Sequence, residues 1–422
     1  MRKTLLIGLA LLTCVSLSAQ QHQDPGAAAA LQENIQRAGN NSHVYEFDPI
    51  HDTRAPKGYK PFYISHYGRH GSRSDWGGRT YQALIRILEQ AQADGLLTAE
   101  GEALLGEARL VNEAHDGMDG RLMQRGVREH ERLAERMFIR YPDVFRKGSK
   151  QIRSISSTVQ RCIISMVGFT NRLNEMQPDL EFYWDTGEKF MEYINTETVR
   201  EVREGERPIL TALDRSYVPD TVFVMQHLFN DPQVARKHVG NVQMFQRMIF
   251  ETARIAEGAD IPTNLFRHIP FDAVYKYWES ANMTLYFEHC NSVEFGSLVM
   301  PTVERLINDI VTKADEAISK GNWAADLRFG HDYPLMTLAS YLGVEGVGDK
   351  LHSDEVSAKW WGFRNIPFAS NLQMVFYRNK AGDVLVKFLY NEKECLLRGL
   401  EPVSGPYYRW ETVKENIKGY LR

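Results

Sequence analysis

Cysteine is scarce in this chain of 422 residues, which has only four. Cys14 falls in an N-terminal leader described below, and the other three lack the close spacing typical of zinc sites or redox motifs. These three can form one disulfide at most. Because Cys162 lies on the apolar face of an expected helix, Cys290 and Cys395 are the candidate pair.

The sequence also lacks a polybasic tract and, beyond its first residues, a long hydrophobic run. The 50 Lys and Arg residues are dispersed and are outnumbered by 54 Asp and Glu residues, which gives a net charge of −4. This balance argues against a nucleic-acid partner. No stretch after the leader approaches the roughly 20 apolar residues of a transmembrane helix, so we expect no membrane span. A hydrophobic content of 43% is enough for a substantial core.

The first 19 residues have the pattern of a secretory signal peptide. Arg2-Lys3 precedes the apolar run 4–12, and Leu17-Ser18-Ala19 offers a small-residue cleavage site after Ala19. A lipoprotein site at Cys14 is the second possibility, disfavoured by the threonine before it. We therefore expect a periplasmic or secreted protein.

Six short apolar runs predict strands, at 61–66, 151–156, 180–184, 325–330, 371–377 and 383–389. Helical stretches lie between them, and strands that alternate with helices favour an α/β fold with a mainly parallel central sheet flanked by helices. The helical segments 80–94, 98–113 and about 234–254 do not alternate with strands. They indicate a mostly helical cap inserted into the core.

A mature chain of about 400 residues suits two units rather than one. We assign the chain to a signal peptide (1–19), an N-terminal segment (20–55), an α/β catalytic core (56–75, 145–190 and 300–422) and a helical cap (76–144 and 191–299). Residues 21–30 are polar and alanine-rich, which predicts a loose tether before the fold.

The most informative stretch runs from Phe62 to Arg73, where a short apolar strand leads into a turn that carries His70 between Arg69 and Arg73. A neutral imidazole can attack phosphorus, and guanidinium groups bind phosphate oxygens while neutralising charge that would repel the attack. Alone, the triplet Arg-His-Gly is weak evidence for a catalytic site, because a histidine at a strand end more often has a structural role. Two further segments favour a phosphate site.

These two segments also follow expected strands. After the strand at 151–156, Arg161 falls near the first turn of an expected helix, where backbone amides and the helix dipole favour an anion. After the strand at 325–330 come His331 and Asp332, followed by another helix. Ligands bind beyond the carboxyl ends of strands in open α/β sheets, so these residues would share one pocket with His70 if the three strands are neighbours.

The three motifs, in this order, resemble those of the histidine acid phosphatases. This is the secreted branch of the histidine phosphatase superfamily, which includes phytases and multiple inositol polyphosphate phosphatases. The run Arg69 to Asp75 matches the family signature Arg-His-Gly-x-Arg-x-Pro, except that Asp75 stands where proline is usual. Gly120 to Gly126 echoes a second family stretch, with Met123 where threonine is usual. The similarity covers about residues 60–172 and 323–390.

The resemblance implies a phosphoglycerate mutase-like core with a helical cap, and an exported phosphomonoesterase that needs no metal and no cofactor. His70 would be the nucleophile that forms a phosphohistidine. Asp332 would donate a proton to the leaving group and then activate water. The implied phosphate-binding residues are Arg69, Arg73, Arg161 and His331.

The expected partner is a small-molecule phosphate monoester, and phytate or another inositol polyphosphate is one candidate. Multiple inositol polyphosphate phosphatases usually carry His-Ala-Glu where this chain has His331-Asp332-Tyr333. A non-catalytic phosphate-ligand binding protein of the cell envelope is the alternative of a different class. A mutase is disfavoured by the leader, because that branch is generally cytoplasmic.

Four other features have an undecided or a purely structural interpretation. Arg153 faces either the site or solvent, and His66 has no evident partner ligands for a metal site. His115-Asp116 is interpreted as a solvated loop. Trp76 and the pair Trp360-Trp361 either line a rim or pack in the interior.

Overall fold

The computed structural model of this chain describes residues 26–196 and 198–420. The predicted signal peptide, its cleavage site and Cys14 lie outside the described residues. Within the described part, none of the helices combines the length and the apolar character that crossing a membrane requires.

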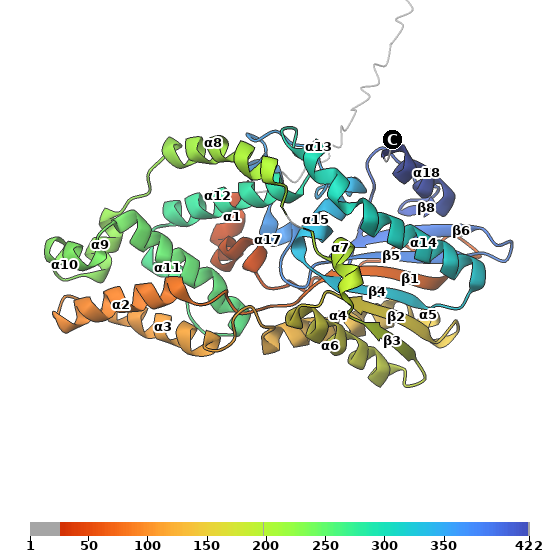
Figure 1. Ribbon diagram of the computed structural model, residues 1–422, viewed down its shortest axis with the longest axis horizontal. Coiled ribbons are helices and arrows are strands. Elements are labelled where there is room, and N and C mark those ends of the chain that lie inside the picture. Colours follow the sequence, from red (N-terminus) through yellow and green to blue (C-terminus); the bar gives the residue numbers. More distant parts are fainter. Residues whose placement is uncertain (1–25, 197, 421–422) are drawn as a thin grey trace, which may run out of the picture.

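A sheet of eight strands occupies one half of the molecule, on the right in Figure 1. Its order is β3-β2-β4-β1-β5-β6-β7, and β8 pairs with β6. The strands are β1 (Lys60–Arg69), β2 (Gln151–Ser156), β3 (Glu181–Asp185), β4 (Ala325–Gly330), β5 (Asn371–Arg378), β6 (Val384–Tyr390), β7 (Lys393–Cys395) and β8 (Tyr407–Arg409). Every residue of β4 is buried, as expected for a central strand with helices on both faces.

The sheet is mostly but not fully parallel. β1, β2, β3 and β4 pair in parallel, whereas β5 runs antiparallel to β1 and the pairs beyond it are antiparallel. The link between β5 and β6 spans only residues 379–383, too short for the crossover that a parallel connection needs. The expected α/β class with its mainly parallel sheet is confirmed.

Helices cover both faces of the sheet (Figure 1). One face packs on α14 (Glu304–Lys320), α15 (Asp332–Tyr341) and α18 (Trp410–Tyr420), and the other on α4 (Gln124–Arg140), α5 (Pro142–Arg146) and α6 (Gln160–Met176). Neighbouring residues of β1 point to opposite faces, so Tyr63 enters the first core and Ile64 the second. α4 packs on the sheet although it falls in the segment 76–144 assigned to the cap. The domain boundaries themselves remain a prediction.

A second group of helices forms the other half of the molecule. Its members are α1 (Gly26–Glu33), η1 (Ile35–Ser42), α2 (Arg79–Ala93), α3 (Ala99–His115), α8 (Arg200–Ser216), α9 (Val222–Leu228), α10 (Pro232–Val239), α11 (Val242–Ala256), η3 (Glu257–Ala259), η4 (Leu265–His268) and α12 (Phe271–His289). Most of them share a separate apolar core that includes Leu84, Leu104, Phe245 and Trp278. The connecting elements are η2 (Glu188–Phe190), α7 (Met191–Ile194), α13 (Gly296–Val299), η5 (Met300–Val303), α16 (Val356–Lys359) and α17 (Gly362–Asn365).

The helical region expected over about 234–254 is confirmed, but it consists of two helices. They are divided at Gly240, whose φ of +63° suits glycine, and Asn241 then caps α11 by accepting a hydrogen bond from the amide of Met244. One local expectation is wrong. The tether expected over 21–30 already begins α1 at residue 26. Leu31 of α1 is completely buried in the cap core, so this segment is part of the fold.

The candidate disulfide is also wrong. Cys162, Cys290 and Cys395 are all free thiols. Cys290 follows the end of α12 in the core on one face of the sheet, and Cys395 ends the short strand β7.

Candidate active site

Three strand ends lie side by side in the parallel part of the sheet. Arg69 pairs with Gly330 across β1 and β4, and Ser156 pairs with Phe329 across β2 and β4. The residues that follow these strands, including His70 and His331, therefore leave the same edge of the sheet. The expectation that the three strands are neighbours is confirmed.

His70 is buried in a tight loop after β1. Its Nδ1 lies 2.9 Å from the carbonyl oxygen of Gly71. A carbonyl only accepts hydrogen bonds, so Nδ1 carries the proton and Nε2 keeps its lone pair. Burial, reinforced by the charges of Arg161 and Arg69, holds the pKa of His70 well below its usual range, so the ring is neutral.

The loop is fixed by close backbone packing against α4. A side chain at Gly71 would overlap the backbone of Gly126, and one at Gly126 would overlap the carbonyl oxygen of Ser72. Buried Glu129 accepts hydrogen bonds from the amide of Ser72 at 2.7 Å and from its hydroxyl at 2.8 Å. The stretch 120–126 thus acts as the floor of the loop rather than as a ligand.

The departure from the family signature at Asp75 has a local explanation. The amide of Asp75 donates a hydrogen bond of 3.1 Å to Nδ1 of His115, which a proline could not donate. His115 is the buried last residue of α3, so the interpretation of His115-Asp116 as a solvated loop is wrong for the histidine.

Arg69 is oriented by four groups. Its Nη1 donates to the carbonyl oxygens of Asn41 at 2.6 Å and Ile366 at 2.8 Å, and its Nη2 lies 2.9 Å from Oδ2 of Asp332. The guanidinium also stacks over the ring of Phe368, 4.7 Å from its centroid. The charge is therefore held in place before any ligand binds.

Arg73 and Arg161 face the same indole. Their guanidinium carbons lie 5.2 Å and 4.8 Å from the centroid of the Trp76 ring, which is 60% exposed. Burial and the charges of Arg161 and Arg69 lower the pKa of Arg73 to about 10. Three guanidinium groups near one another are thus poised to bind an anion. Trp76 lies on the solvent side of this cluster.

His331 lies beside His70, with 5.8 Å between the ring centroids. Its Nε2 is 3.0 Å from the hydroxyl of Ser157, and its Nδ1 is 3.4 Å from Nη2 of Arg161. Burial and the charge of Arg161 lower the pKa of His331 to about 4.

Asp332 opens α15 beside the cluster. Its Oδ2 contacts Nη2 of Arg69 and accepts a hydrogen bond of 3.1 Å from Nδ2 of Asn41. Burial opposes ionisation of this carboxyl, but the positive charge of Arg69 outweighs it, with a further contribution from His331 only when that ring is protonated, and the pKa of Asp332 is lowered to about 2. The side chain is a carboxylate in the ligand-free site.

The structure thus brings together all six residues that the sequence singled out: Arg69, His70, Arg73, Arg161, His331 and Asp332. With both histidines neutral, three guanidinium groups and one carboxylate leave a net charge of +2. This charge matches a phosphate dianion.

Several supporting residues carry no motif in the sequence. Asn41 lies 291 positions from Asp332 along the chain and contacts both Asp332 and Arg69. Ser157 positions His331, and the thiol of Cys162 lies 3.7 Å from the same imidazole. Burial raises the pKa of Cys162 to about 11, which agrees with the expectation of an unreactive thiol.

Other residues from the sequence analysis lie elsewhere. Arg153 pairs with Asp326 at 2.5 Å and with Glu316 at 2.6 Å, so it is a structural ion-pair residue. His66 is buried in the core beneath the site. Trp360 and Trp361 are buried as well, which settles their packing role.

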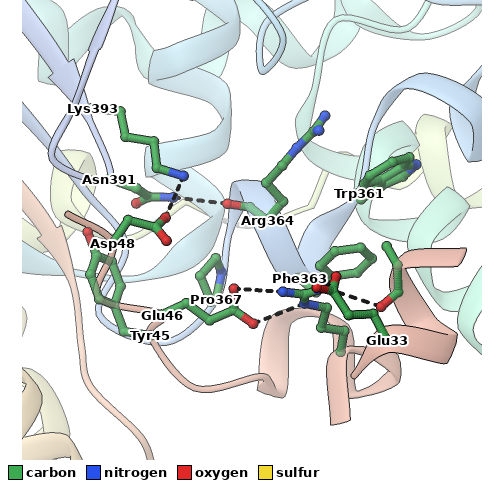
Figure 2. Close-up of a pocket in the computed structure, with 12 residues that line it drawn as sticks. Glu33, Tyr45, Glu46, Asp48, Trp361, Phe363, Arg364, Pro367, Asn391 and Lys393 are labelled. Atoms are coloured by element: carbon green, nitrogen blue, oxygen red, sulfur yellow. Dashed lines mark hydrogen bonds and ion pairs between the residues drawn. The ribbon is translucent and has the colours of Figure 1, made fainter. Parts of the chain in front are cut away.

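A hollow of about 300 Å³ contains none of the six site residues. Most of its charged side chains are paired: Arg37 pairs with Glu33 and Glu46, and Lys393 pairs with Asp48, the latter pair being visible in Figure 2. This hollow offers no uncompensated charge to a phosphate. The cluster around His70 therefore remains the candidate site.

Comparisons with known proteins show the fold. No protein-family profile and no curated protein sequence matches the chain. Among solved structures, a multiple inositol polyphosphate phosphatase from Bifidobacterium longum in complex with phosphate has a TM-score of 0.72 at 16% identity, covering 92% of this chain and 98% of that one. The chain shares the fold of this phosphatase.

Two phytases have the same fold. The phytase of D. castellii has a TM-score of 0.68 at 12% identity, over 95% of this chain and 89% of its own. The Hafnia alvei phytase in complex with tartrate has a TM-score of 0.52 at 11% identity, over 86% and 98%. The histidine acid phosphatase resemblance noted in the sequence is thus confirmed at the level of the fold.

Proposed function

We propose that this protein is an exported phosphomonoesterase that transfers phosphate to His70 and then to water without a metal ion. One observation carries the proposal: a neutral, singly oriented imidazole lies beside three guanidinium groups and a His-Asp pair at three adjacent strand ends. The fold shared with phosphatases and phytases supports it.

In the first step, Nε2 of His70 attacks phosphorus in line and the bond from phosphorus to the ester oxygen breaks. Nδ1 keeps its proton and donates a hydrogen bond to the carbonyl oxygen of Gly71, which fixes the ring while the P–N bond forms. Arg69, Arg73 and Arg161 bind the equatorial oxygens, where negative charge is spread in the transition state.

Asp332 supplies the proton that the departing alkoxide needs. The free carboxyl is ionised, because its pKa is about 2. Substrate oxygens that share Arg69 with Asp332 compensate the guanidinium charge, which raises the pKa of Asp332 and lets it carry a proton brought by the substrate monoanion. In the second step, Asp332 takes a proton from water as water attacks phosphorus and the P–N bond breaks.

Inositol polyphosphates are the substrate class we propose to test first. The support is that two of the fold neighbours described above are phytases and the third is an inositol polyphosphate phosphatase. Export rests on the N-terminal leader alone, and sequencing the N-terminus of the processed protein should give Gln20 as the first residue.

Phosphate release is the direct test of this function. Purified protein should release phosphate from phytate or from sugar phosphates between pH 4 and 6, with equal rates before and after chelation by EDTA. The variant His70→Ala should lose nearly all of this activity. A wild-type protein that binds phosphate tightly but hydrolyses none of these esters would instead be the non-catalytic binding protein.

A further inference from the structure

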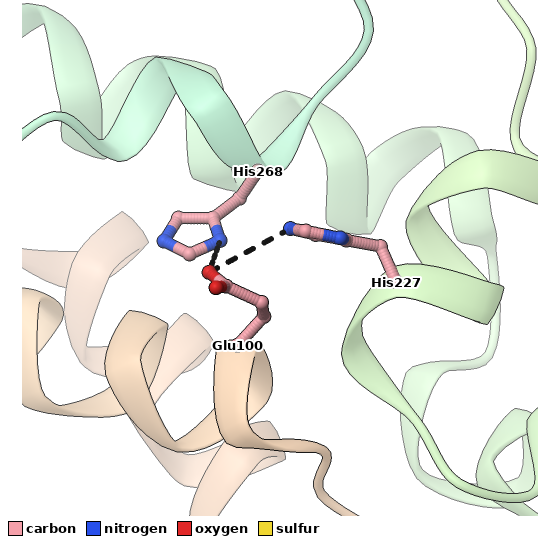
Figure 3. A group of neighbouring side chains, drawn as sticks. All are labelled: Glu100, His227 and His268. Atoms are coloured by element: carbon pink, nitrogen blue, oxygen red, sulfur yellow. Dashed lines mark ion pairs between the residues drawn. The ribbon is translucent and has the colours of Figure 1, made fainter.

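Three side chains converge in the helical cap, on elements outside the sheet edge that carries the phosphate site (Figures 1 and 3). They are Glu100 in the first turn of α3, His227 near the end of α9 and His268 at the end of η4. Oε2 of Glu100 lies 3.9 Å from Nε2 of His227 and 3.8 Å from Nδ1 of His268. The three ligand atoms all lie within 4.8 Å of one another.

These atoms are buried and unsatisfied. Glu100 Oε2, His227 Nε2 and His268 Nδ1 each lack a hydrogen-bond partner among the described residues, and separations of 3.8–3.9 Å are too long for hydrogen bonds between them. The side chain of His268 is completely buried. Buried polar atoms rarely lack a hydrogen bond, so three such atoms within 4.8 Å of one another, related only by long ion-pair contacts, point to a ligand between them.

The surroundings favour a cation as that ligand. Nε2 of His268 lies 3.2 Å from Oε2 of Glu107, and when it donates its proton there, Nδ1 presents a lone pair toward Glu100. A carboxylate behind a histidine is the usual outer partner of a metal-binding imidazole.

The backbone around the cluster is also fixed. The hydroxyl of Thr98 donates to the carbonyl oxygen of His227 at 2.7 Å and accepts from the amide of Gly101 at 3.1 Å. The start of α3 is thereby tied to the end of α9, so two of the three converging side chains stand on a rigid frame.

We propose that Glu100, His227 and His268 bind a zinc ion that joins α3, α9 and η4. Two imidazole nitrogens and one carboxylate oxygen suit Zn²⁺, whereas Ca²⁺ and Mg²⁺ prefer oxygen ligands. Tetrahedral ligands about 2.1 Å from zinc stand about 3.4 Å apart, so the two distances to Glu100 need to close by only about 0.5 Å. Water would complete the site on the side where Glu100 is 47% exposed.

Among the described residues, Arg267 is the cation that contacts Glu100. Its Nε lies 3.6 Å from Oε2 of Glu100, and its Nη1 pairs with Glu107 at 2.5 Å. The carboxylates of Glu100 and Glu107 and the guanidinium of Arg267 together have a net charge of −1. A divalent ion is therefore attracted, while Arg267 keeps Glu107 as its partner.

Zinc uptake by the untagged protein, stripped with EDTA, tests the proposal. Calorimetric titration with Zn²⁺ and elemental analysis should find one bound ion per chain. Glu100→Gln and His227→Ala, which change partly exposed side chains, should each weaken binding more than 100-fold, and Glu107→Gln by 10–100-fold. His352→Ala is the matched surface control, because this histidine is 62% exposed and lies 3.9 Å from Glu294.

Two further measurements place the ion. His70→Ala should bind zinc as tightly as the wild type, because none of the three zinc ligands takes part in the proposed phosphoryl transfer. Saturating zinc should raise the Tm of the wild type by roughly 3 °C and leave that of Glu100→Gln unchanged. The proposal is wrong if the wild type takes up no zinc at concentrations of about 100 µM, or if Glu100→Gln and His227→Ala bind it as the wild type does.

Discussion

At the scale of residues, the candidate site is defined by how charge is distributed before a ligand arrives. Arg69 is held by two carbonyl oxygens and by Asp332. Burial, together with the positive charges of Arg161 and Arg69, depresses the pKa of His70, and the charge of Arg69 depresses that of Asp332 against the effect of burial. The nucleophile is consequently neutral and the acid ionised in the same empty site. Substrate must bring the proton that Asp332 later donates.

A neutral His70 beside an ionised Asp332 predicts an acidic pH optimum. The dependence of kcat/KM on pH reports free enzyme and free substrate. His70 stays neutral well below pH 6.5, so activity should persist toward pH 4, and it should fall above about pH 6, where a phosphate monoester loses its last proton. A profile measured with a sugar phosphate checks this. A loss of activity on the acid side centred near pH 6.5 would show that His70 is not depressed.

Asp332→Asn should separate substrates by their leaving groups. General acid catalysis contributes about 10²–10⁴-fold when the leaving group needs a proton. Single-turnover transfer from sugar or inositol phosphates should fall by that range, while transfer from p-nitrophenyl phosphate should fall less than about 10-fold. Equal losses on both would mean that Asp332 only shapes the pocket around Arg69.

The six site residues could be predicted from the sequence because each lies within four residues of a strand end or at a helix start, within a recognisable motif. Asn41 could not, since its contact with Asp332 joins residues 291 positions apart and part of its role is played by a backbone carbonyl. The orientation of Arg153 could not be predicted from the sequence either, because its partner Glu316 lies on a helix whose position depends on the whole fold.

At the scale of elements, the loop after β1 depends on its contact with α4. The backbones of Gly71 and Gly126 approach so closely that neither position has room for a side chain. The position of the nucleophile is thus set by a helix whose own sequence contributes no group to the chemistry.

Gly126→Ala should therefore displace the loop. We expect kcat to fall at least 10-fold, together with a loss of stability of about 1–3 kcal/mol from overpacking. Gly106→Ala is the matched control, because it is also a helical glycine but a Cβ there would meet nothing within 4 Å. It should leave kcat unchanged and stabilise α3 by about 0.5–1 kcal/mol. Parallel assays and urea unfolding measure both, and unchanged activity in Gly126→Ala would contradict this account of the loop.

Strands were easier to predict than their directions. Each expected apolar run begins within one residue of the start of a strand. For central strands such as β4 and β5, burial on both faces leaves a continuous hydrophobic pattern, whereas the edge strand β3 is only partly buried. The antiparallel direction of β5 follows from pairing with β1 across the sheet, which no local pattern records. The break between α10 and α11 had a local signal in Gly240-Asn241, a helix-ending residue followed by a capping one.

At the scale of the whole molecule, buried histidines link stability to pH. Burial lowers the pKa of His66 and of His130 to about 3, so the unfolded chain binds more protons than the folded one between about pH 3 and 6.5. The stability that these two histidines contribute is therefore fully present above pH 6.5 and is lost as the pH falls toward 3.

Replacing His130 should reduce this sensitivity. Each such histidine contributes a slope of up to about 1.4 kcal/mol per pH unit, so His130→Leu should lower the slope of unfolding free energy between pH 4.5 and 6 by about that amount. Urea unfolding at several pH values measures it. A variant with the wild-type slope would show that His130 does not titrate on unfolding.

The arrangement of the two halves could be predicted only in outline. The sequence indicated a helical group that does not alternate with strands, and the structure has such a group with its own core. It did not indicate that α1 would join that core, because a short alanine-rich segment has little hydrophobic pattern. The burial of Leu31 depends on residues that are distant in the sequence. No spacing in the sequence indicated that Glu100, His227 and His268 would lie close together in the fold.

Trapping the phosphoenzyme tests the central claim most directly. Wild-type protein mixed with a ³²P-labelled substrate and quenched within milliseconds should carry acid-labile, base-stable phosphate on the peptide that contains His70, and His70→Ala should carry none. Label on another residue, or near-normal turnover by His70→Ala, would contradict the account.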